Sequence, residues 1–330
     1  MSFLKKINLR AKTSINTGFG TNNAAYGGRY VNKNGIPNVD KRGLSFFERI
    51  SWFHTLLQLS TPKFLSVIFL FFVSINFLFA LLYCWIGIEH LGGLNAATTM
   101  EKFGEAYFFS AQTFTTVGYG RINPTGFLAS AVASFEALLG LLTFAIFTGL
   151  FYGRFSKPQA FLKFSGNALL APFKDGLAIM MRVAPFKNNN LTDAEAKLTV
   201  GLTFEEDGAI VNRFFLMDME YSHVNALTLS WTIVHPINEE SPFYNFTKED
   251  FANTRGEILV FVKAFDDMFS NTVVARSSYT LNEIVMGAKF VPMYHRNDEK
   301  NTTVLDLEKL NTYTAVDIDS YFKKDDSRKD

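Results

Sequence analysis

The sequence has little cysteine and almost no net charge, and each shortage excludes a class of protein. A single cysteine among 330 residues excludes an intramolecular disulfide framework and a cysteine-based metal cluster. The 32 lysines and arginines nearly balance the 31 acidic residues, so no general affinity for nucleic acid is indicated. No apolar run follows the basic N-terminus, which is therefore not a signal peptide. The five histidines lack metal-ligand spacing and no catalytic constellation stands out, so an enzyme is not indicated.

Charge is also scarce in two long apolar runs. Residues 64–88 carry no formal charge, and residues 127–153 carry only Glu136. A membrane span needs about 20 mostly apolar residues, so both runs are predicted to cross a bilayer. Two buried core helices are the alternative, but soluble helices of this length keep a polar face.

Basic residues are distributed unevenly around these spans. Residues 1–63 contain ten lysines and arginines, whereas the loop 89–126 contains only Lys102 and Arg121. Further basic residues follow the second span. By the positive-inside rule, both termini are predicted to be cytoplasmic and the loop to lie outside, in a multi-pass protein of the inner (cell) membrane.

The loop contains a shorter apolar piece, residues 103–115, which is predicted to be a re-entrant pore helix. TTVGYG follows it, and non-helical backbone at membrane depth must line water or be buried in protein. Glycines tolerate unusual dihedrals, so successive carbonyls can turn to one side. A ring of four such strands forms oxygen cages that replace the hydration shell of potassium, which predicts a homotetramer. The predicted filter is Thr116, Val117, Gly118, Tyr119 and Gly120, with K⁺ held at the first four.

Seven motifs in order carry a resemblance to a known family. They are WFHTLLQLSTPKF (52–64), AYFFSAQTFTTVGYG (106–120), SKP (156–158), SWTIVHPINEESPFY (230–244), EILVFV (257–262), ARSSY (275–279) and EIVMGAKFVP (283–292). From about residue 43 to about residue 310, the chain resembles the inward-rectifier potassium channels, specifically their bacterial branch. The resemblance implies a two-span pore with potassium as the permeant ion and no cofactor.

The C-terminal half shows short β-rich runs with turn signals and little helical periodicity, which predicts an antiparallel sandwich. The resemblance implies an immunoglobulin-like cytoplasmic domain assembled as a four-fold ring. No GxGxxG motif follows a strand, which argues against a nucleotide-binding regulatory domain. The predicted divisions are a mobile N-terminus (1–40), a slide helix and pore domain (41–157), the sandwich (158–310) and a C-terminal tail (311–330).

Basic residues near the inner membrane surface are candidates for binding anionic phospholipid. Residues 43–59 are amphipathic with Arg42 and Arg49 opposite the apolar face, typical of a helix lying in the interface; an ordinary linker helix is the alternative. Arg154 and Lys157 match positions that bind phosphoinositides in animal relatives, and basic clusters attract anionic lipid on general grounds. Plain positive-inside anchoring is the alternative for this pair.

Four residues of the second span are candidates for the cavity and gate. Gly140 matches a hinge glycine, although glycine also allows close helix packing. Tyr152 matches the inner bundle crossing, where four rings would form a dewettable gate, or it is an interfacial aromatic residue. Phe144 matches the position where strong rectifiers place an acidic or polar residue in the cavity, so block by Mg²⁺ or polyamines is expected to be weak. Glu136 differs from Phe144 in helical phase by about 80°, which favours a buried partner behind the filter over a cavity-facing ring.

Other positions depart from the family pattern or add charge. Gln112 replaces a common glutamate and Arg121 a common aspartate, and both departures put the usual bracing of the filter in doubt. The cation Arg121 at the outer mouth is also expected to lower conductance. Acidic residues expected to face a cytoplasmic pore are Asp266, Asp267 and Glu206, with a solvated hairpin tip as the alternative for Glu206.

Three functions remain open at this point. The first is a tetrameric inward-rectifier-type potassium channel, and the second is a less selective cation channel altered by Arg121. The third is a membrane-anchored sandwich that binds or senses without conducting, against which the intact TVGYG argues.

Overall fold

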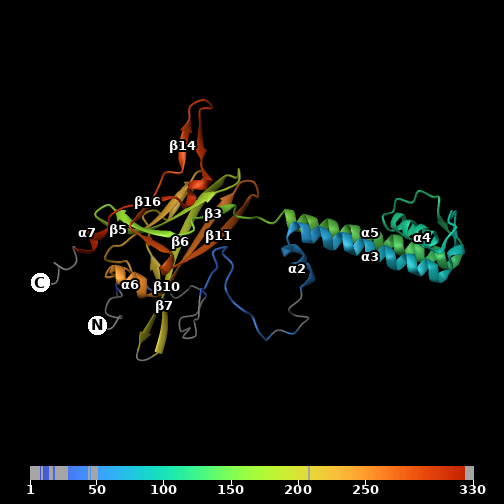
Figure 1. Cartoon of the computed structure of the whole chain (residues 1–330), viewed down its shortest axis with the longest axis horizontal. Coiled ribbons are helices and arrows are strands. Elements are labelled where there is room, and N and C mark those ends of the chain that lie inside the picture. Colours follow the sequence, from blue (N-terminus) through green and yellow to red (C-terminus); the bar gives the residue numbers. More distant parts are fainter. Residues whose placement is uncertain are drawn as a thin grey trace. The chain divides into compact units, whose positions relative to one another are not determined.

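The computed structural model describes residues 8, 10–14, 18, 29–43, 45, 51–206 and 209–323. The chain forms two compact units, one of residues 41–157 and one of residues 1–40 together with 158–330 (Figure 1). The first unit is helical and the second is built on β-strands.

The helical unit contains two long apolar helices, and both are long and apolar enough to cross a membrane. Pro62 lies in the first turn of the first long helix, where proline is tolerated, and Gly87 follows its last residue with a φ of 119°. The elements of this unit are α2 (Trp52–Gln58), α3 (Thr61–Ile86), β1 (Leu91–Gly92), α4 (Thr99–Phe114), β2 (Asn123–Pro124) and α5 (Phe127–Phe155).

Helix α4 is the short helix that we predicted over residues 103–115, and it begins earlier, at Thr99. The Thr98 side chain accepts a hydrogen bond from the Glu101 backbone N–H, while the Glu101 carboxylate accepts one from the Thr98 N–H. This capping box satisfies backbone groups that a helix end leaves open, which explains the earlier start. Figure 1 shows α4 beside the C-terminal end of α3 and the N-terminal end of α5.

The predicted sandwich is confirmed as two five-stranded sheets. One has the order β11-β10-β6-β7 with β8 beside β6, and the other has the order β12-β4-β5-β3 with β9 beside β5. The first sheet is antiparallel throughout, and the second contains one parallel pair, β12 with β4. The strands are β3 (Leu162–Phe164), β4 (Ala168–Phe173), β5 (Gly176–Pro185), β6 (Leu191–Glu206), β7 (Ala209–Met217), β8 (His223–Ala226), β9 (Trp231–Pro236), β10 (Arg255–Asp266), β11 (Asn271–Thr280) and β12 (Ile284–Met286).

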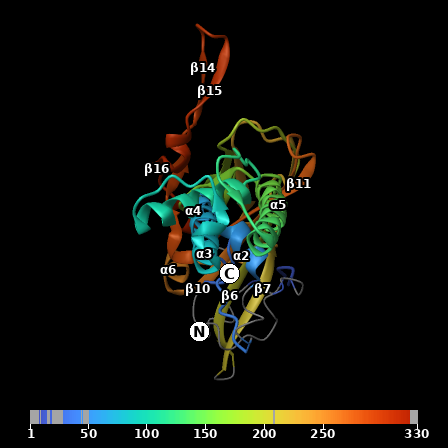
Figure 2. The same ribbon diagram turned by 90° about the vertical axis from the view of Figure 1, so that its right-hand side faces the viewer.

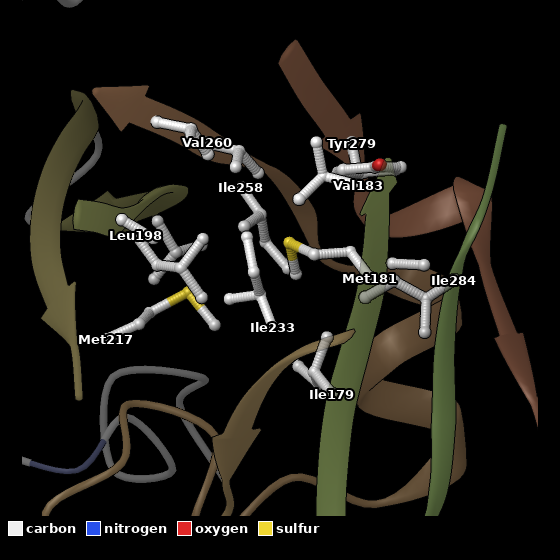
Figure 3. Close-up of a cluster of buried hydrophobic side chains, with 14 of the residues drawn as sticks. Ile179, Met181, Val183, Leu198, Met217, Ile233, Ile258, Val260, Tyr279 and Ile284 are labelled. Atoms are coloured by element: carbon white, nitrogen blue, oxygen red, sulfur yellow. The ribbon is translucent and has the colours of Figure 1, made fainter. Parts of the chain in front are cut away.

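Alternate residues of the strands fill the space between the sheets (Figure 3). Ile179 and Met181 of β5 face this core together with Leu198 of β6 and Ile258 of β10, and all four are fully buried. Each such side chain stabilises the fold by roughly 1.5–3 kcal/mol relative to exposure. Met180, one residue out of phase, belongs to a second apolar cluster on the opposite face of its sheet.

The remaining elements extend the β-rich unit beyond the predicted boundary at residue 310. β16 pairs with β13, and Ile318 is buried, so part of the predicted tail is packed against the domain. Figure 2 shows the β14–β15 hairpin projecting from the rest of its own unit. These elements are α6 (Lys248–Asn253), β13 (Ala288–Phe290), β14 (Tyr294–Asn297), β15 (Thr302–Leu305), β16 (Tyr313–Ala315) and α7 (Asp319–Lys323).

Part of the N-terminal segment that we predicted to be mobile packs on the β-rich unit. The buried carboxylate of Glu257 accepts hydrogen bonds from the backbone N–H groups of Tyr30 at 2.5 Å and Val31 at 3.1 Å. Arg29 forms an ion pair of 2.9 Å with Glu283. Residues 29–31 are therefore held by specific contacts, which their Asn/Gly-rich surroundings in the sequence did not indicate.

His235 lies in the signature HPINEESP and is buried in the β-rich unit. Its Nδ1–H donates to the backbone carbonyl of Asp218 at 2.5 Å, and its Nε2 lies 2.8 Å from Ser241 Oγ, which donates to it. Burial lowers the pKa of His235 to about 4, since the site offers the charged imidazolium no carboxylate partner that outweighs desolvation.

The stability of this domain is therefore expected to fall in mild acid through His235. Its pKa is 6.5 in a model peptide and about 4 when folded, so the unfolded state binds more protons between these values. The contribution of neutral His235 to the free energy of unfolding is present above pH 6.5 and declines as the pH falls towards 4. The loss between pH 6.5 and pH 5 is about 2 kcal/mol. Thermal unfolding of the full chain, followed by circular dichroism, should show a shallower loss of Tm with acid in His235→Asn than in the parent. The exposed His223, changed to Asn, is the matched control, and parallel slopes for parent and His235→Asn would contradict the assignment.

Candidate functional site

The loop that follows α4 has an irregular backbone with repeated left-handed residues. Thr116, Gly118 and Gly120 have φ values of 59°, 53° and 84°. The carbonyl of Gln112, in the last turns of α4, accepts the N–H groups of Val117 at 2.9 Å and Gly118 at 3.3 Å. Alternation of left-handed and ordinary residues turns neighbouring carbonyls in the same general direction, as an oxygen-lined ion path requires.

The side chains of this loop make little contact within one chain. Tyr119 is 80% exposed and Val117 is 53% exposed. Large apolar side chains exposed at this level usually mark a surface that another molecule or subunit covers.

Arg121, directly after the loop, is held by a residue of α4. Its Nη2 lies 2.5 Å from Glu105 Oε2, and its Nη1 donates to the carbonyl of Gly93 at 3.4 Å. The ion pair is half-exposed, so its contribution to stability is modest. It nevertheless places a carboxylate beside the cation that we expected at the mouth of the loop.

Glu136 is fully buried and contacts residues from two other helices. One carboxyl oxygen lies 2.6 Å from the hydroxyl of Tyr83 on α3, and the other lies 2.5 Å from Ser110 Oγ on α4. Ser110 Oγ also lies 2.9 Å from Asn76 Oδ1. The structure thus places Glu136 behind the loop, among polar partners, rather than on an exposed face of α5.

Gly140 lies on the same buried stripe of α5 and meets the end of α4. A Cβ at this position would lie 1.9 Å from the carbonyl oxygen of Phe114, the last residue of α4. No Cβ is tolerated at that distance, so glycine is required for this approach. The stripe comprises Ala129, Ala133, Glu136, Gly140, Thr143 and Leu150.

Phe144 and Tyr152 of α5 are not among the buried residues of that stripe. They are 73% and 74% exposed within one chain. Their assignment to a cavity and a gate stays a prediction.

Of the basic candidates, Arg154 is engaged within the helical unit. Its guanidinium donates to Thr61 Oγ1 at 3.2 Å and to the carbonyl of Leu57 at 3.4 Å, and it lies 5.1 Å from the ring centre of Phe64. Lys157, like Arg42, is exposed. Arg49 and most of the amphipathic stretch before α2 lie outside the described residues.

The acidic candidates do not form one exposed group. Asp266, expected to face a pore, is fully buried. Its carboxylate accepts hydrogen bonds from Asn189 Nδ2 at 2.9 Å and from the N–H groups of Met268 and Phe269 at the turn between β10 and β11. That prediction was wrong, because a carboxylate needed to satisfy turn N–H groups is withdrawn from solvent. Asp267 is exposed, and the side chain of Glu206 lies outside the described residues.

Four residues near the loop were not assigned from the sequence, namely Asn76, Tyr83, Glu105 and Ser110. Two of them could have been found. Asn76 and Tyr83 are polar residues seven positions apart in an apolar run, and this spacing places them on one helical face. The pairing of Glu105 with Arg121 depends on the path of the loop between them, which no local sequence pattern predicts.

Among the described residues, no group of histidine, cysteine, aspartate or glutamate could hold a resident metal ion. The loop after α4 offers a cation backbone carbonyls and hydroxyl oxygens, among them that of Thr116. Such neutral oxygens suit a cation that passes through, because they replace water without binding as strongly as carboxylates.

Comparison with known proteins divides the chain in a similar way. A family model described as "Inward rectifier potassium channel C-terminal domain" matches residues 162–330, and one described as "Ion channel" matches residues 64–157. The chain is 34% identical over 273 residues to "Inward rectifier potassium channel Kirbac3.1" of Paramagnetospirillum magnetotacticum, covering 81% of this chain and 89% of that protein. It is 28% identical over 298 residues to "G protein-activated inward rectifier potassium channel 2" of Pongo abelii, covering 82% and 69%. A sporulation control protein of Bacillus subtilis, Spo0M, aligns in structure with a TM-score of 0.21 and 11% identity over 38% of this chain and 49% of its own, too slight a likeness to bear on the fold.

We expect Gly140→Ala to damage the site, because its Cβ would overlap the Phe114 carbonyl and push α4 away from α5. Overpacking of this kind costs about 1–3 kcal/mol or more. Gly149→Ala is the matched control on the same helix, since a Cβ there meets nothing within 4 Å and removes a helix-weakening glycine. Size-exclusion chromatography and Tm in detergent measure the effect. Equal yield and Tm for the two variants would show that the contact at Gly140 is not close.

Proposed function

The chain belongs to the inward rectifier potassium channel family, and on that premise we propose that four copies form a channel that conducts potassium passively through residues 116–120. The family consists of ion channels rather than enzymes. The observation that carries the proposal is the left-handed backbone at Thr116, Gly118 and Gly120, placed between a short helix and a long apolar helix.

Potassium selectivity follows from what this backbone offers to the ion. Carbonyl oxygens stacked in rings of four replace the hydration shell of potassium. One chain supplies only one side of each ring, so conduction requires a homotetramer. The exposure of Val117 and Tyr119 in one chain supports this, because both side chains are free to pack against neighbouring copies.

A less selective cation channel is the second candidate, and Arg121 favours it. A cation at the outer mouth repels permeant ions, and its side chain is 54% exposed. The ion pair with Glu105 supports the first candidate instead, because it offsets much of that charge within the same subunit.

The gate and the blocking site belong to the same proposal. Four Tyr152 rings at the inner end of α5 would narrow the path to a constriction that loses water easily. With Phe144 in the cavity, internal Mg²⁺ or polyamines would bind weakly there and rely on exposed acidic groups such as Asp267. Both termini and the β-rich unit would then lie in the cytoplasm, which the excess of basic residues before the first span supports.

Anionic phospholipid is proposed to bias this gate through Arg154 and Lys157. Arg154 lies two residues after Tyr152, on the last turn of α5. Its guanidinium donates hydrogen bonds to Thr61 and Leu57, which leaves further donors for a lipid headgroup. Lys157, which follows this helix, is exposed. Basic residues near an anionic surface contribute roughly 1 kcal/mol each, and a tetramer multiplies that.

The filter assignment predicts loss of selectivity when the loop backbone or its packing is changed. Gly118→Asp places a side chain at a left-handed residue and an acid beside the path, and Tyr119→Ala removes a ring that is exposed in one chain and free to pack against a neighbouring copy. Either variant should lose its preference for potassium over sodium in flux from liposomes, whereas Tyr107→Ala, on the half-buried side of α4, should keep it. The assignment fails if the loop variants discriminate as well as the parent.

The lipid proposal predicts that Arg154→Gln combined with Lys157→Gln makes flux nearly insensitive to phosphoinositide while selectivity stays intact. The measurement is potassium flux in liposomes with and without the lipid, at equal protein incorporation. Because Arg154 also contacts Thr61, Thr61→Val is the control that removes this contact without removing charge. A full lipid response in the double variant would reject the site and leave the pair as positive-inside anchors. A lost response in Thr61→Val would trace the effect to the helix contact rather than to lipid.

A further inference from the structure

The polar side chains around Glu136 share few hydrogens among several oxygen atoms. The four members of this cluster come from three helices, and all are buried: Asn76, Ser110 and Glu136 are 0% exposed and Tyr83 is 1% exposed. Buried polar groups must be paired, so each hydrogen and each acceptor in such a cluster needs a partner.

The orientation of the Asn76 amide is settled by its other contact. Its nitrogen lies 2.7 Å from the backbone carbonyl of Phe72, which can only accept a hydrogen bond. The amide oxygen therefore faces Ser110, where it can only accept.

Ser110 consequently touches two oxygens with a single hydrogen. Its Oγ lies 2.9 Å from the Asn76 amide oxygen and 2.5 Å from a carboxyl oxygen of Glu136. If Glu136 were ionised, both oxygens would be acceptors competing for one hydrogen, and one contact would join two oxygens with no hydrogen between them. If Glu136 is protonated, it donates to Ser110, and Ser110 donates to Asn76.

The charges near Glu136 favour the same protonated state. Among the described residues, no lysine, arginine or histidine makes an ion pair with Glu136, and Tyr83 is the one titratable group in hydrogen-bond contact with it. An unpaired carboxylate buried among membrane helices is costly, whereas a neutral acid with both oxygens paired is not. The chain then runs in one direction: Tyr83 donates to Glu136, Glu136 to Ser110, Ser110 to Asn76, and Asn76 to the Phe72 carbonyl.

We propose that Glu136 is a neutral carboxylic acid whose one-way chain of hydrogen bonds holds α4 between α3 and α5, and that it is thereby a positioning residue for the filter. Ser110 is the one member of this series of hydrogen bonds that lies on α4. It lies two residues before Gln112, whose carbonyl holds the N–H groups of Val117 and Gly118. A shift of α4 at Ser110 is therefore carried directly to the filter loop. The part of this claim that concerns the filter rests on the proposed function, whereas the protonation of Glu136 does not.

Infrared spectroscopy tests the protonation state without any flux. At neutral pH, the purified parent should show a carbonyl stretching band of a protonated carboxylic acid that is missing from E136Q. A difference spectrum that contains only carboxylate bands would overturn the proposal. This result is independent of conduction, so failure of the channel assignment would leave it intact.

Ion flux tests the positioning role. E136Q should keep a K⁺/Na⁺ flux ratio within about twofold of the parent, because the amide supplies one donor and one acceptor in the places of the acid. S110A should lower the ratio about tenfold, because it leaves a buried donor and a buried acceptor unpaired beside α4. S134A is the matched control, since Ser134 is exposed and donates only to Ser130 of its own helix at 2.8 Å.

Two outcomes would contradict the positioning role. If S110A lowers the Tm of the assembled protein but keeps the parental flux ratio, the cluster stabilises the fold without positioning the filter. If E136Q loses selectivity as S110A does, an ionised carboxylate is required at residue 136. If no variant or parent carries potassium, the proposed function fails, and the infrared result alone then decides the state of Glu136.

Discussion

The structure of the helical unit depends on one constraint: backbone polar groups in an apolar medium must find partners. Helices α3 and α5 satisfy their own backbones, but residues 115–121 are not helical and cannot. Such a segment persists only where neighbouring elements hold it and where water or ions reach its carbonyls. The capping box that starts α4, the carbonyl of Gln112 that receives two loop N–H groups, and the ion pair of Arg121 all hold this segment in place.

Close packing on one stripe of α5 provides the rest of the support. Gly140 lets the Phe114 carbonyl approach the helix backbone, and Glu136, one turn earlier, reaches Ser110 and Tyr83. The two contacts fix α4 at its last residue and one turn before it. These contacts fix the point at which the loop leaves α4, while Val117 and Tyr119 stay exposed in one chain.

Properties that depend on local sequence could be predicted, and properties that depend on long-range contacts could not. The two apolar runs, the TVGYG loop and the sandwich class follow from run length, glycine placement and the alternation of apolar residues. Asp266 was misassigned because its carboxylate is held by the N–H groups of its own turn and by Asn189, which lies far away in the sequence. Arg154 was predicted to bind anionic lipid or to act as a positive-inside anchor, and its hydrogen bonds to Thr61 and Leu57 were not predicted. The packing of residues 29–31 depends on a glutamate more than two hundred positions later, and composition cannot reveal such a partner.

The central claim is that this chain, as a tetramer, conducts potassium in preference to sodium. The most direct measurement is the reversal potential of the purified parent protein in planar bilayers with potassium on one side and sodium on the other. The account predicts a single-peak tetramer in chromatography and a reversal potential close to the equilibrium potential of potassium. A reversal potential near zero would contradict selectivity and favour the less selective cation channel, and absence of current at verified incorporation would contradict conduction itself.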